Sequence, residues 1–157
     1  MKNNIKKRIW ILIIVLLSIV GISMYGIPKY FQEENKVPQV CGVEKCFTVE
    51  LARTAAEQEL GLMNRTTMEE DHGMLFIFSK SDLYNFWMKN TRIPLDMLRI
   101  DDHFKVARIM TAQPCTVDPC MIYNPEVWAM YVLEINSGIA AKYGIVEWSV
   151  MKFQNTK

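Results

Sequence analysis

The chain has 157 residues, of which 50% are hydrophobic and 22% charged, and its formal net charge is +1. This length allows one ordinary domain with an additional segment, and the composition is not that of a disordered chain. After position 8 the chain carries 14 basic and 17 acidic residues, a net charge of −3, without a basic patch. The composition therefore argues against a nucleic-acid partner.

An uncharged apolar run lies close to the N-terminus. Residues 9–27 contain no charge, and as a helix they would be about 28 Å long, enough for a bilayer core about 30 Å thick. Four basic residues precede the run, so the positive-inside rule places residues 1–8 in the cytoplasm. We therefore expect a transmembrane signal-anchor over residues 9–28, a linker over residues 29–40 and an extracytoplasmic domain over residues 41–157.

This arrangement predicts a single-pass membrane protein whose domain lies in the periplasm or on the cell surface. The alternative is secretion after cleavage of a signal peptide. A signal peptide usually has a shorter apolar region followed by an Ala-x-Ala-like site. The nearest match here is Gly21-Ile22-Ser23, which is poor, so the uncleaved anchor is the favoured interpretation.

The four cysteines form two pairs with the same spacing, namely Cys41 with Cys46 and Cys115 with Cys120. Outside the cytoplasm, an even number of cysteines favours disulfide bonds. The prolines around the second pair indicate a rigid turn, which favours local pairing, although four cysteines allow three pairings. A structural zinc site made from the four thiolates is the alternative.

The first half of the domain alternates strands with one helix. Residues 46–52 alternate apolar and polar side chains, as in a half-buried strand. Thr54 and Glu57 have the spacing of a capping box, which predicts a helix over residues 55–63. Further strands are expected over residues 73–78 and 84–90.

The second half is richer in strands. Residues 95–101 and 104–110 predict two strands joined by a hairpin turn at residues 101–103. We also expect a strand over residues 129–135, a helical turn between a Ser137 cap and Gly144, and a strand over residues 148–153. With about seven strands and two short helices, the predicted fold is a single small α+β domain with a largely antiparallel, barrel-like sheet, preceded by one transmembrane helix.

Several short motifs occur in a specific order between residues 46 and 153. They are Phe47-x-Val49-Glu50-x-Ala52, Gly61-Leu62-Met63-x-Arg65, Gly73-Met74-Leu75-Phe76, Phe86 to Asp96, Pro114-Cys115 to Cys120-x-x-Tyr123, and Val132-Leu133-Glu134 with Gly138. In this order the chain resembles the domain of unknown function 192 family. The resemblance implies a compact, strand-rich single domain, often exported or attached to a membrane, and it brings no established activity. One departure is Trp148-Ser149, where many members have a Gly-Asp turn.

The stretch from Phe86 to Asp96 joins apolar side chains to polar ones. In a functional interpretation, Lys89, Asn90 and Asp96 bind an anionic or carbonyl group, and Trp87 forms an apolar wall. In a structural interpretation, Lys89 pairs with Asp96 across the Ile-Pro turn, and the Asn90 side chain bonds to the backbone. As a strand, this stretch would place Trp87, Lys89 and Thr91 on one face. The structural interpretation is favoured, because buried polar groups usually have structural partners.

Three further charged residues have similarly open roles. Arg65 follows the predicted helix, where it could clamp a carboxylate or stabilise the helix C-terminus. Glu134 lies among apolar residues of a strand, which suits acid–base chemistry, whereas the alternation around Glu50 points that side chain outward. His72 and His103 fall in predicted turns, and two unrelated histidines make a weak metal site.

From these observations we expect a membrane-anchored, extracytoplasmic module that binds a small ligand or peptide and contacts the membrane through its N-terminal helix. One alternative is a hydrolase or lyase that uses Asp96, Glu134 or His72 as a base, which requires these residues to converge in one pocket. Another is a structural, zinc-stabilised module. No cofactor is expected and no catalytic residue is assigned. The expected binding groove is edged by Arg65, Trp87, Lys89, Asn90, Asp96 and Glu134.

Overall fold

The computed structural model describes residues 36–156, and the segment Val37–Lys157 forms one compact unit. The predicted transmembrane segment, residues 9–28, lies outside the described residues. Within the described part, no helix has the length and apolar character needed to span a bilayer.

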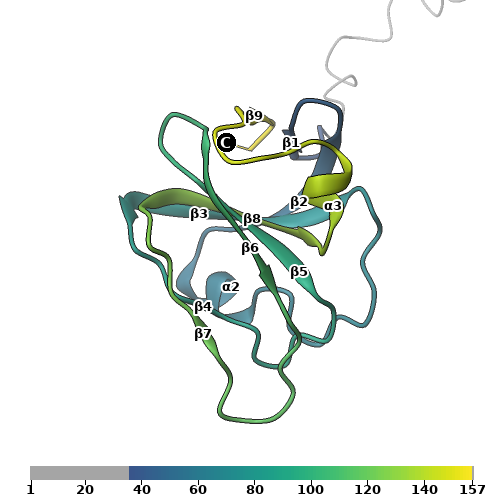
Figure 1. The fold of residues 1–157 in the computed structure, drawn as a ribbon, viewed down its shortest axis with the longest axis vertical. Coiled ribbons are helices and arrows are strands. Elements are labelled where there is room, and N and C mark those ends of the chain that lie inside the picture. Colours follow the sequence, from purple (N-terminus) through teal and green to yellow (C-terminus); the bar gives the residue numbers. More distant parts are fainter. Residues whose placement is uncertain (1–35, 157) are drawn as a thin grey trace, which may run out of the picture. The chain divides into compact units, whose positions relative to one another are not determined.

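The described part is dominated by one sheet of seven strands, in the order β6-β5-β8-β3-β2-β1-β9, which curls into a half barrel (Figure 1). A separate pair consists of β4 and β7, and two short helices complete the described elements. The elements are β1 (Gln39–Cys41), β2 (Cys46–Ala52), α2 (Ala55–Leu60), β3 (His72–Asp82), β4 (Phe86–Trp87), β5 (Leu95–Ile100), β6 (Val106–Ala112), β7 (Ile122–Tyr123), β8 (Ala129–Asn136), α3 (Ile139–Lys142) and β9 (Lys152–Gln154).

The expected predominance of antiparallel pairing is confirmed. Every neighbouring pair in the main sheet is antiparallel except β2 and β3, which run parallel. A parallel pair needs a crossover connection rather than a hairpin, and α2 lies in this connection. The sequence pattern predicted both strands and the helix between them, but not that the two strands would be neighbours.

The helix α2 begins as its sequence predicts. The Thr54 hydroxyl accepts a hydrogen bond from the Glu57 N–H at 3.3 Å, and the Glu57 carboxylate accepts one from the Thr54 N–H at 2.8 Å. The helix ends at Leu60, earlier than expected, because Gly61 adopts a left-handed φ of 48°. For α3 the expected Ser137 cap is wrong, since Gly138 occupies the cap position at φ 83° without a side-chain hydrogen bond.

Two hydrophobic clusters cover the two faces of the main sheet, because successive side chains of a strand point to opposite faces. Along β8, Leu133 and Ile135 belong to one cluster, whereas Val132 belongs to the other. Figure 1 shows α3 and β9 above the sheet and α2, β4 and β7 below it. We call the face of Leu133 the upper face and the face of Val132 the lower face.

Two predicted strands are much shorter than expected. The strand expected over residues 84–90 is reduced to β4, because Asn90 adopts a left-handed φ of 56° and turns the chain. The last strand starts only at Lys152, since Trp148 has a φ of 75° and its N–H bonds to the Val106 carbonyl. The short strands β1 and β7 were not predicted, because two or three residues give no readable alternation.

The cysteines form the two local disulfide bonds, Cys41–Cys46 and Cys115–Cys120, and none of them is free. The favoured pairing is therefore confirmed and the zinc alternative is wrong, because a thiolate site needs unoxidised cysteines. The first bond joins β1 to β2, whereas the second closes the loop that precedes β7.

Candidate functional site

A small pocket opens on the lower face, between the turn that follows α2 and the segment 86–91. Its volume is about 30 Å³, which suffices for a water-sized group. Three of the six residues expected at a binding groove line it, namely Trp87, Lys89 and Glu134. The other lining residues are Gln58, Glu59, Leu60, Gly61, Leu62, Met63, Phe76, Phe86 and Thr91.

Glu134 supplies a carboxyl group at the base of this pocket. Its residue on β8 pairs with Met74 of β3 on one side and Met97 of β5 on the other. Glu134 is only 4% exposed, and no described residue donates a hydrogen bond to its carboxyl. Burial raises the pKa of this carboxyl to about 8, although the positive charge of Arg99 opposes the rise. At neutral pH the group is therefore mostly protonated and can both donate and accept a hydrogen bond.

The close approach of β3 to β8 at this point depends on Gly73. A Cβ atom at Gly73 would lie 2.5 Å from the backbone oxygen of Glu134, which no real contact allows. Only glycine therefore permits this pairing without a shift of the strands. Met74 follows Gly73 in β3, so the same strand pairing also places Met74 beside Glu134.

A second charged residue, Arg99 of β5, is completely buried on the lower face. Its guanidinium donates hydrogen bonds to the carbonyl oxygens of Tyr84 and Tyr123, and it lies 4.8 Å from the centre of the Phe86 ring. Its Nε atom has no hydrogen-bond partner among the described residues. Burial lowers the pKa of Arg99 to about 10, with Glu134 opposing the change, so the side chain remains charged at neutral pH.

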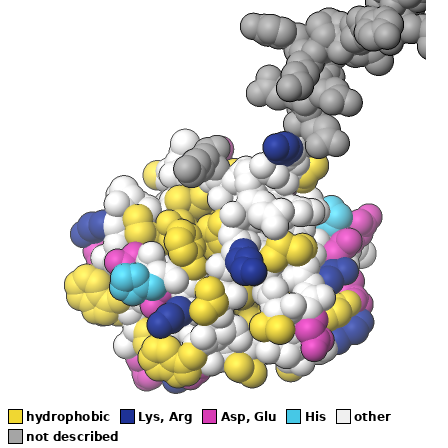
Figure 2. All heavy atoms as spheres, turned by 90° about the horizontal axis from the view of Figure 1, so that it is seen from above, with side chains coloured by type: hydrophobic (Ala, Val, Ile, Leu, Met, Phe, Trp, Pro, Cys, Tyr) yellow, Lys and Arg dark blue, Asp and Glu magenta, His cyan; other side chains and the backbone are white. Residues whose placement is uncertain are grey.

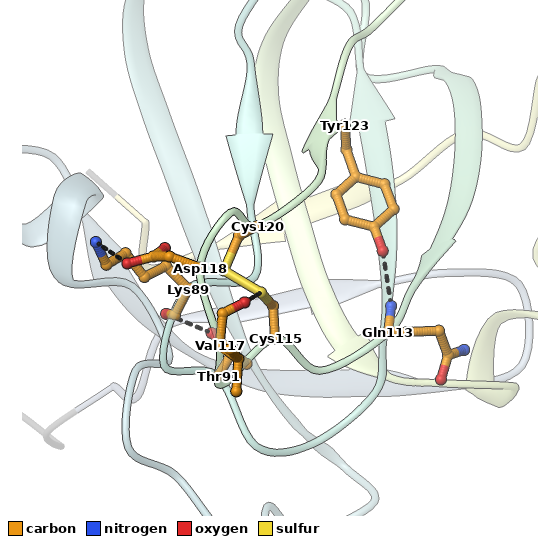
Figure 3. Close-up of a disulfide and its surroundings, with 8 residues drawn as sticks. All are labelled: Lys89, Thr91, Gln113, Cys115, Val117, Asp118, Cys120 and Tyr123. Carbon is orange, nitrogen blue, oxygen red and sulfur yellow. Dashed lines mark hydrogen bonds and ion pairs between the residues drawn. A yellow bond between two sulfur atoms is a disulfide. The ribbon is translucent and has the colours of Figure 1, made fainter.

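The rim of the pocket is held by the loop of the second disulfide (Figure 3). Cys115 forms backbone bridges with both Lys89 and Thr91. The Lys89 ammonium lies 3.2 Å from an Asp118 carboxylate oxygen and 5.5 Å from the centre of the Trp87 ring. The expected Lys89–Asp96 ion pair is therefore wrong, because the carboxylate that meets Lys89 comes from the disulfide loop.

Asp96 lies on the upper face, away from the pocket. It is 3% exposed, and its carboxylate accepts hydrogen bonds from the Thr111 hydroxyl at 2.9 Å and from the Ala140 N–H at 3.2 Å. The second bond satisfies a free backbone donor in the first turn of α3, which has no side-chain cap of its own. Asp96 is thus a structural residue that joins β5, β6 and α3.

The other two expected groove residues also have structural partners. The Arg65 guanidinium lies 2.5 Å from the Glu50 carboxylate, and Glu50 points outward as its alternation predicted. Asn90 uses its backbone rather than its side chain: its N–H bonds to the Cys115 carbonyl and its carbonyl accepts from the Asn64 N–H, both at 2.8 Å. Neither residue lines the pocket.

The residues proposed for acid–base chemistry do not converge. Glu134 faces the pocket on the lower face, whereas Asp96 is on the upper face. The His72 Nδ1 atom lies 2.9 Å from the Asp71 carboxylate, and His72 does not line the pocket. The hydrolase or lyase alternative required a shared pocket, so its proposed set of bases is not supported.

One group of side chains has the geometry to hold a cation. Ligand atoms of Glu69, Asp71 and His72 lie within 4.8 Å of one another. The two acidic residues are exposed, and His72 Nδ1 is already close to both carboxylates. The arrangement is that of a surface ion-pair group, whose contribution to stability is small.

Arg99 was not identified from the sequence as a member of the site, and Thr91 was placed on the face of Trp87 and Lys89 but not among the expected groove residues. Thr91 is 5% exposed and lines the pocket, but its hydroxyl looks ordinary in a polar stretch. Arg99 is one of two charged residues, with Asp96, in the otherwise apolar β5, and this pattern resembles the one that drew attention to Glu134. The sequence does not give the register of β5 against β8, and this register places Arg99 and Glu134 on the same face of the sheet.

The raised pKa of Glu134 predicts a pH-dependent stability. The folded state holds this proton up to about pH 8, whereas the unfolded chain releases it near 4.5. Between these values the folded state binds more protons, so its free energy of unfolding falls as pH rises. In Glu134→Gln this fall should be shallower by up to about 1.4 kcal/mol per pH unit. Urea unfolding at several pH values from 5 to 8 measures both slopes, and equal slopes would contradict a raised pKa.

The structural role of Asp96 predicts a loss of stability rather than of binding. Asp96→Ala removes two hydrogen bonds to a buried carboxylate and should lower the free energy of unfolding by about 3 kcal/mol. Thr111→Val removes only one of them and should cost about 1 kcal/mol. Denaturant unfolding of the two variants measures the difference. An Asp96→Ala protein as stable as the wild type would refute the capping role.

Two solved structures are similar to this chain. One is a protein from Sinorhizobium meliloti 1021 described as a candidate transcription regulator, with 32% identity and a TM-score of 0.68, over 77% of this chain and 97% of that one. The other is a protein of unknown function from Novosphingobium aromaticivorans DSM 12444, with 36% identity and a TM-score of 0.65, over 74% of this chain and 83% of that one. No curated protein matches the chain.

A family model also matches, over residues 38–153, and it is the model of the DUF192 family, described as an uncharacterised ACR. The match covers nearly all of the described part and the same motifs that suggested the resemblance. The chain therefore belongs to the DUF192 family, the domain of unknown function 192.

Proposed function

We propose that the protein is a membrane-tethered, extracytoplasmic module that binds a small ligand or peptide at the lower-face pocket. The observation that carries the proposal is the Glu134 carboxyl, which lies at the pocket without a hydrogen-bond partner among the described residues. The Glu134 oxygens are not fully enclosed, since among the described residues the one enclosed side-chain atom without a partner is Arg99 Nε, so a group that enters the pocket can reach them. A largely buried polar group in a native structure normally bonds to protein or to water, and a ligand group can take that place at Glu134.

The surroundings of Trp87 suit the body of such a ligand. A second pocket of about 190 Å³ adjoins the first and shares Phe86 and Trp87 with it. Trp87 is 43% exposed, and its cross-strand partner Ile122 is 56% exposed. Pockets of this kind combine apolar walls with a few polar groups that fix orientation. The small volume of the first pocket, about 30 Å³, admits one polar group, while the rest of the ligand lies against Trp87.

The charges at the pocket favour a ligand with a donor and an acceptor close together. The protonated Glu134 carboxyl can bond to either kind of group, and the Lys89 ammonium at the rim bonds only to acceptors. Lys89 is held in place by Asp118 and by the Trp87 ring. An amide group, as in a peptide bond, offers both functions. We therefore favour peptides and small amides as the ligand class.

The description of the Sinorhizobium meliloti protein as a candidate transcription regulator is not adopted for this chain. The chain after position 8 has a net charge of −3. Nucleic-acid binding relies on basic groups that neutralise phosphates. The two disulfide bonds instead support a location in an oxidising compartment.

The binding proposal is tested by NMR titration of the Val37–Lys157 unit, which contains both hydrophobic clusters and both disulfides. The probes are acetamide, N-methylacetamide and a set of capped dipeptides. We expect chemical-shift changes at Trp87, Lys89 and Glu134, and a loss of affinity of about tenfold in Trp87→Ala. Trp128→Ala is the matched control, because Trp128 is 62% exposed and lines neither pocket. Shifts confined to other surfaces, or equal losses in both variants, would refute the site.

The proposed membrane topology has its own test. Alkaline phosphatase folds only in an oxidising compartment, so a fusion after residue 36 should be active and a fusion after residue 8 inactive. Cell fractionation then separates the anchor from a cleaved signal peptide, since only the anchored protein stays in the membrane fraction. An inactive fusion at residue 36 would contradict an extracytoplasmic domain.

A further inference from the structure

A larger groove lies on the upper face, separate from the pocket at Glu134. Its volume is about 610 Å³, and it shares no lining residue with that pocket. Ile77, Tyr131 and Phe153, which line the groove, pack against the upper hydrophobic cluster. Figure 2 views the molecule from above, where hydrophobic side chains gather across the middle of this face between charged ones.

Three aromatic rings from separate parts of the chain form the walls of the groove. The rings of Phe104 and Tyr131 are stacked, with centres 5.6 Å apart and an angle of 19° between their planes. Phe153 meets both rings edge-on, at 5.0 Å from Phe104 and 4.9 Å from Tyr131. They come from the β5–β6 turn, from β8 and from β9, so the fold brings them together at the open side of the half barrel.

The position of Phe104 is maintained against its own conformational preference. Its φ is 61°, a left-handed value that a bulky residue rarely adopts. The Asp101 carboxylate holds the turn by accepting hydrogen bonds from the N–H groups of His103 at 2.9 Å and Lys105 at 2.8 Å. The ring remains 39% exposed although it stacks on Tyr131. Strained residues of this kind are concentrated at binding sites.

Among the described residues that line the groove, Arg53 is the only charged one. One of its guanidinium nitrogens donates to the Thr156 carbonyl at 2.6 Å, and none of the ion pairs among the described residues involves Arg53. The neighbouring acidic side chain, Glu57, is engaged with the backbone N–H groups of Arg53 and Thr54. The remaining guanidinium donors therefore have no carboxylate partner in the described part of the chain.

We propose that this groove binds a small carboxylate with an aromatic or aliphatic body. The body lies against the rings of Phe104, Tyr131 and Phe153, and the carboxylate bonds to the Arg53 guanidinium. The volume of the groove is within the range of small-molecule sites, about 300–1,000 Å³. A guanidinium is the side chain that best matches a carboxylate, because its fork can donate two parallel hydrogen bonds.

The test uses 4-phenylbutyrate and its neutral analogue 4-phenylbutyramide, titrated into the Val37–Lys157 unit and followed by NMR. We expect both ligands to shift resonances at Ile77, Tyr131 and Phe153, and the carboxylate to bind about tenfold more tightly. In Arg53→Gln the two ligands should bind equally. Arg108→Gln is the matched control, because Arg108 lies outside the groove and already pairs with Glu126.

A second variant tests the contribution of the aromatic rings to binding without disturbing the fold. Phe104→Asn removes the ring but suits the left-handed turn, which asparagine tolerates. It should weaken both ligands at least about fivefold without lowering the thermal stability. The proposal is overturned if neither ligand shifts groove resonances up to about 20 mM, if wild type binds both equally, or if Arg53→Gln weakens both alike. Trp87→Ala should leave this binding unchanged, so the outcome is independent of the pocket at Glu134.

Discussion

The register of β8 between β5 and β3 is the constraint on which the rest of the structure depends. It sets Leu133 and Ile135 into the upper cluster and Val132 and Glu134 toward the lower face. A shift of one residue would exchange these faces and bury Glu134 among the aliphatic residues of the upper core. Gly73 allows β3 to come close enough for this register to form. The position of the pocket therefore follows from the strand pairing rather than from the loops around it.

The lower face carries two buried ionisable side chains, Arg99 and Glu134. They differ in how the unfavourable burial of a charge is avoided or compensated. Arg99 keeps its charge and donates to two carbonyl oxygens close to β4 and in β7, which attaches this strand pair to the main sheet. Glu134 lacks such partners and stays mostly neutral at neutral pH, because an unpaired buried carboxylate would be far more costly. One residue thus acts as a structural clamp, and the other remains available for a ligand.

Periodicity and turn chemistry predicted much of the fold. The strand over residues 46–52, the Thr54–Glu57 capping box and both local disulfides occur as expected. The parallel pairing of β2 with β3 was not predicted, because neighbouring strands in a sheet are chosen by long-range packing. Likewise, Glu134 stood out in the sequence because its neighbours in the strand are apolar. The alternation within one strand does not show which charged residues of other strands lie on the same face of the sheet. That Arg99 shares the face of Glu134 follows only from the pairing of β5 with β8.

The stretch from Phe86 to Asp96 looked like one polar cluster in the sequence, but the structure divides it between the two faces of the sheet. Its first part, from Phe86 to Thr91, is held by Cys115 and contributes Phe86, Trp87, Lys89 and Thr91 to the pocket lining. Its last residues enter β5, where Asp96 turns to the upper face and caps α3. The left-handed Asn90 lies near the end of the first part, where the chain turns toward the second. Polar residues that are neighbours in sequence therefore serve two purposes here: Lys89 and Thr91 line the pocket, and Asp96 stabilises the fold.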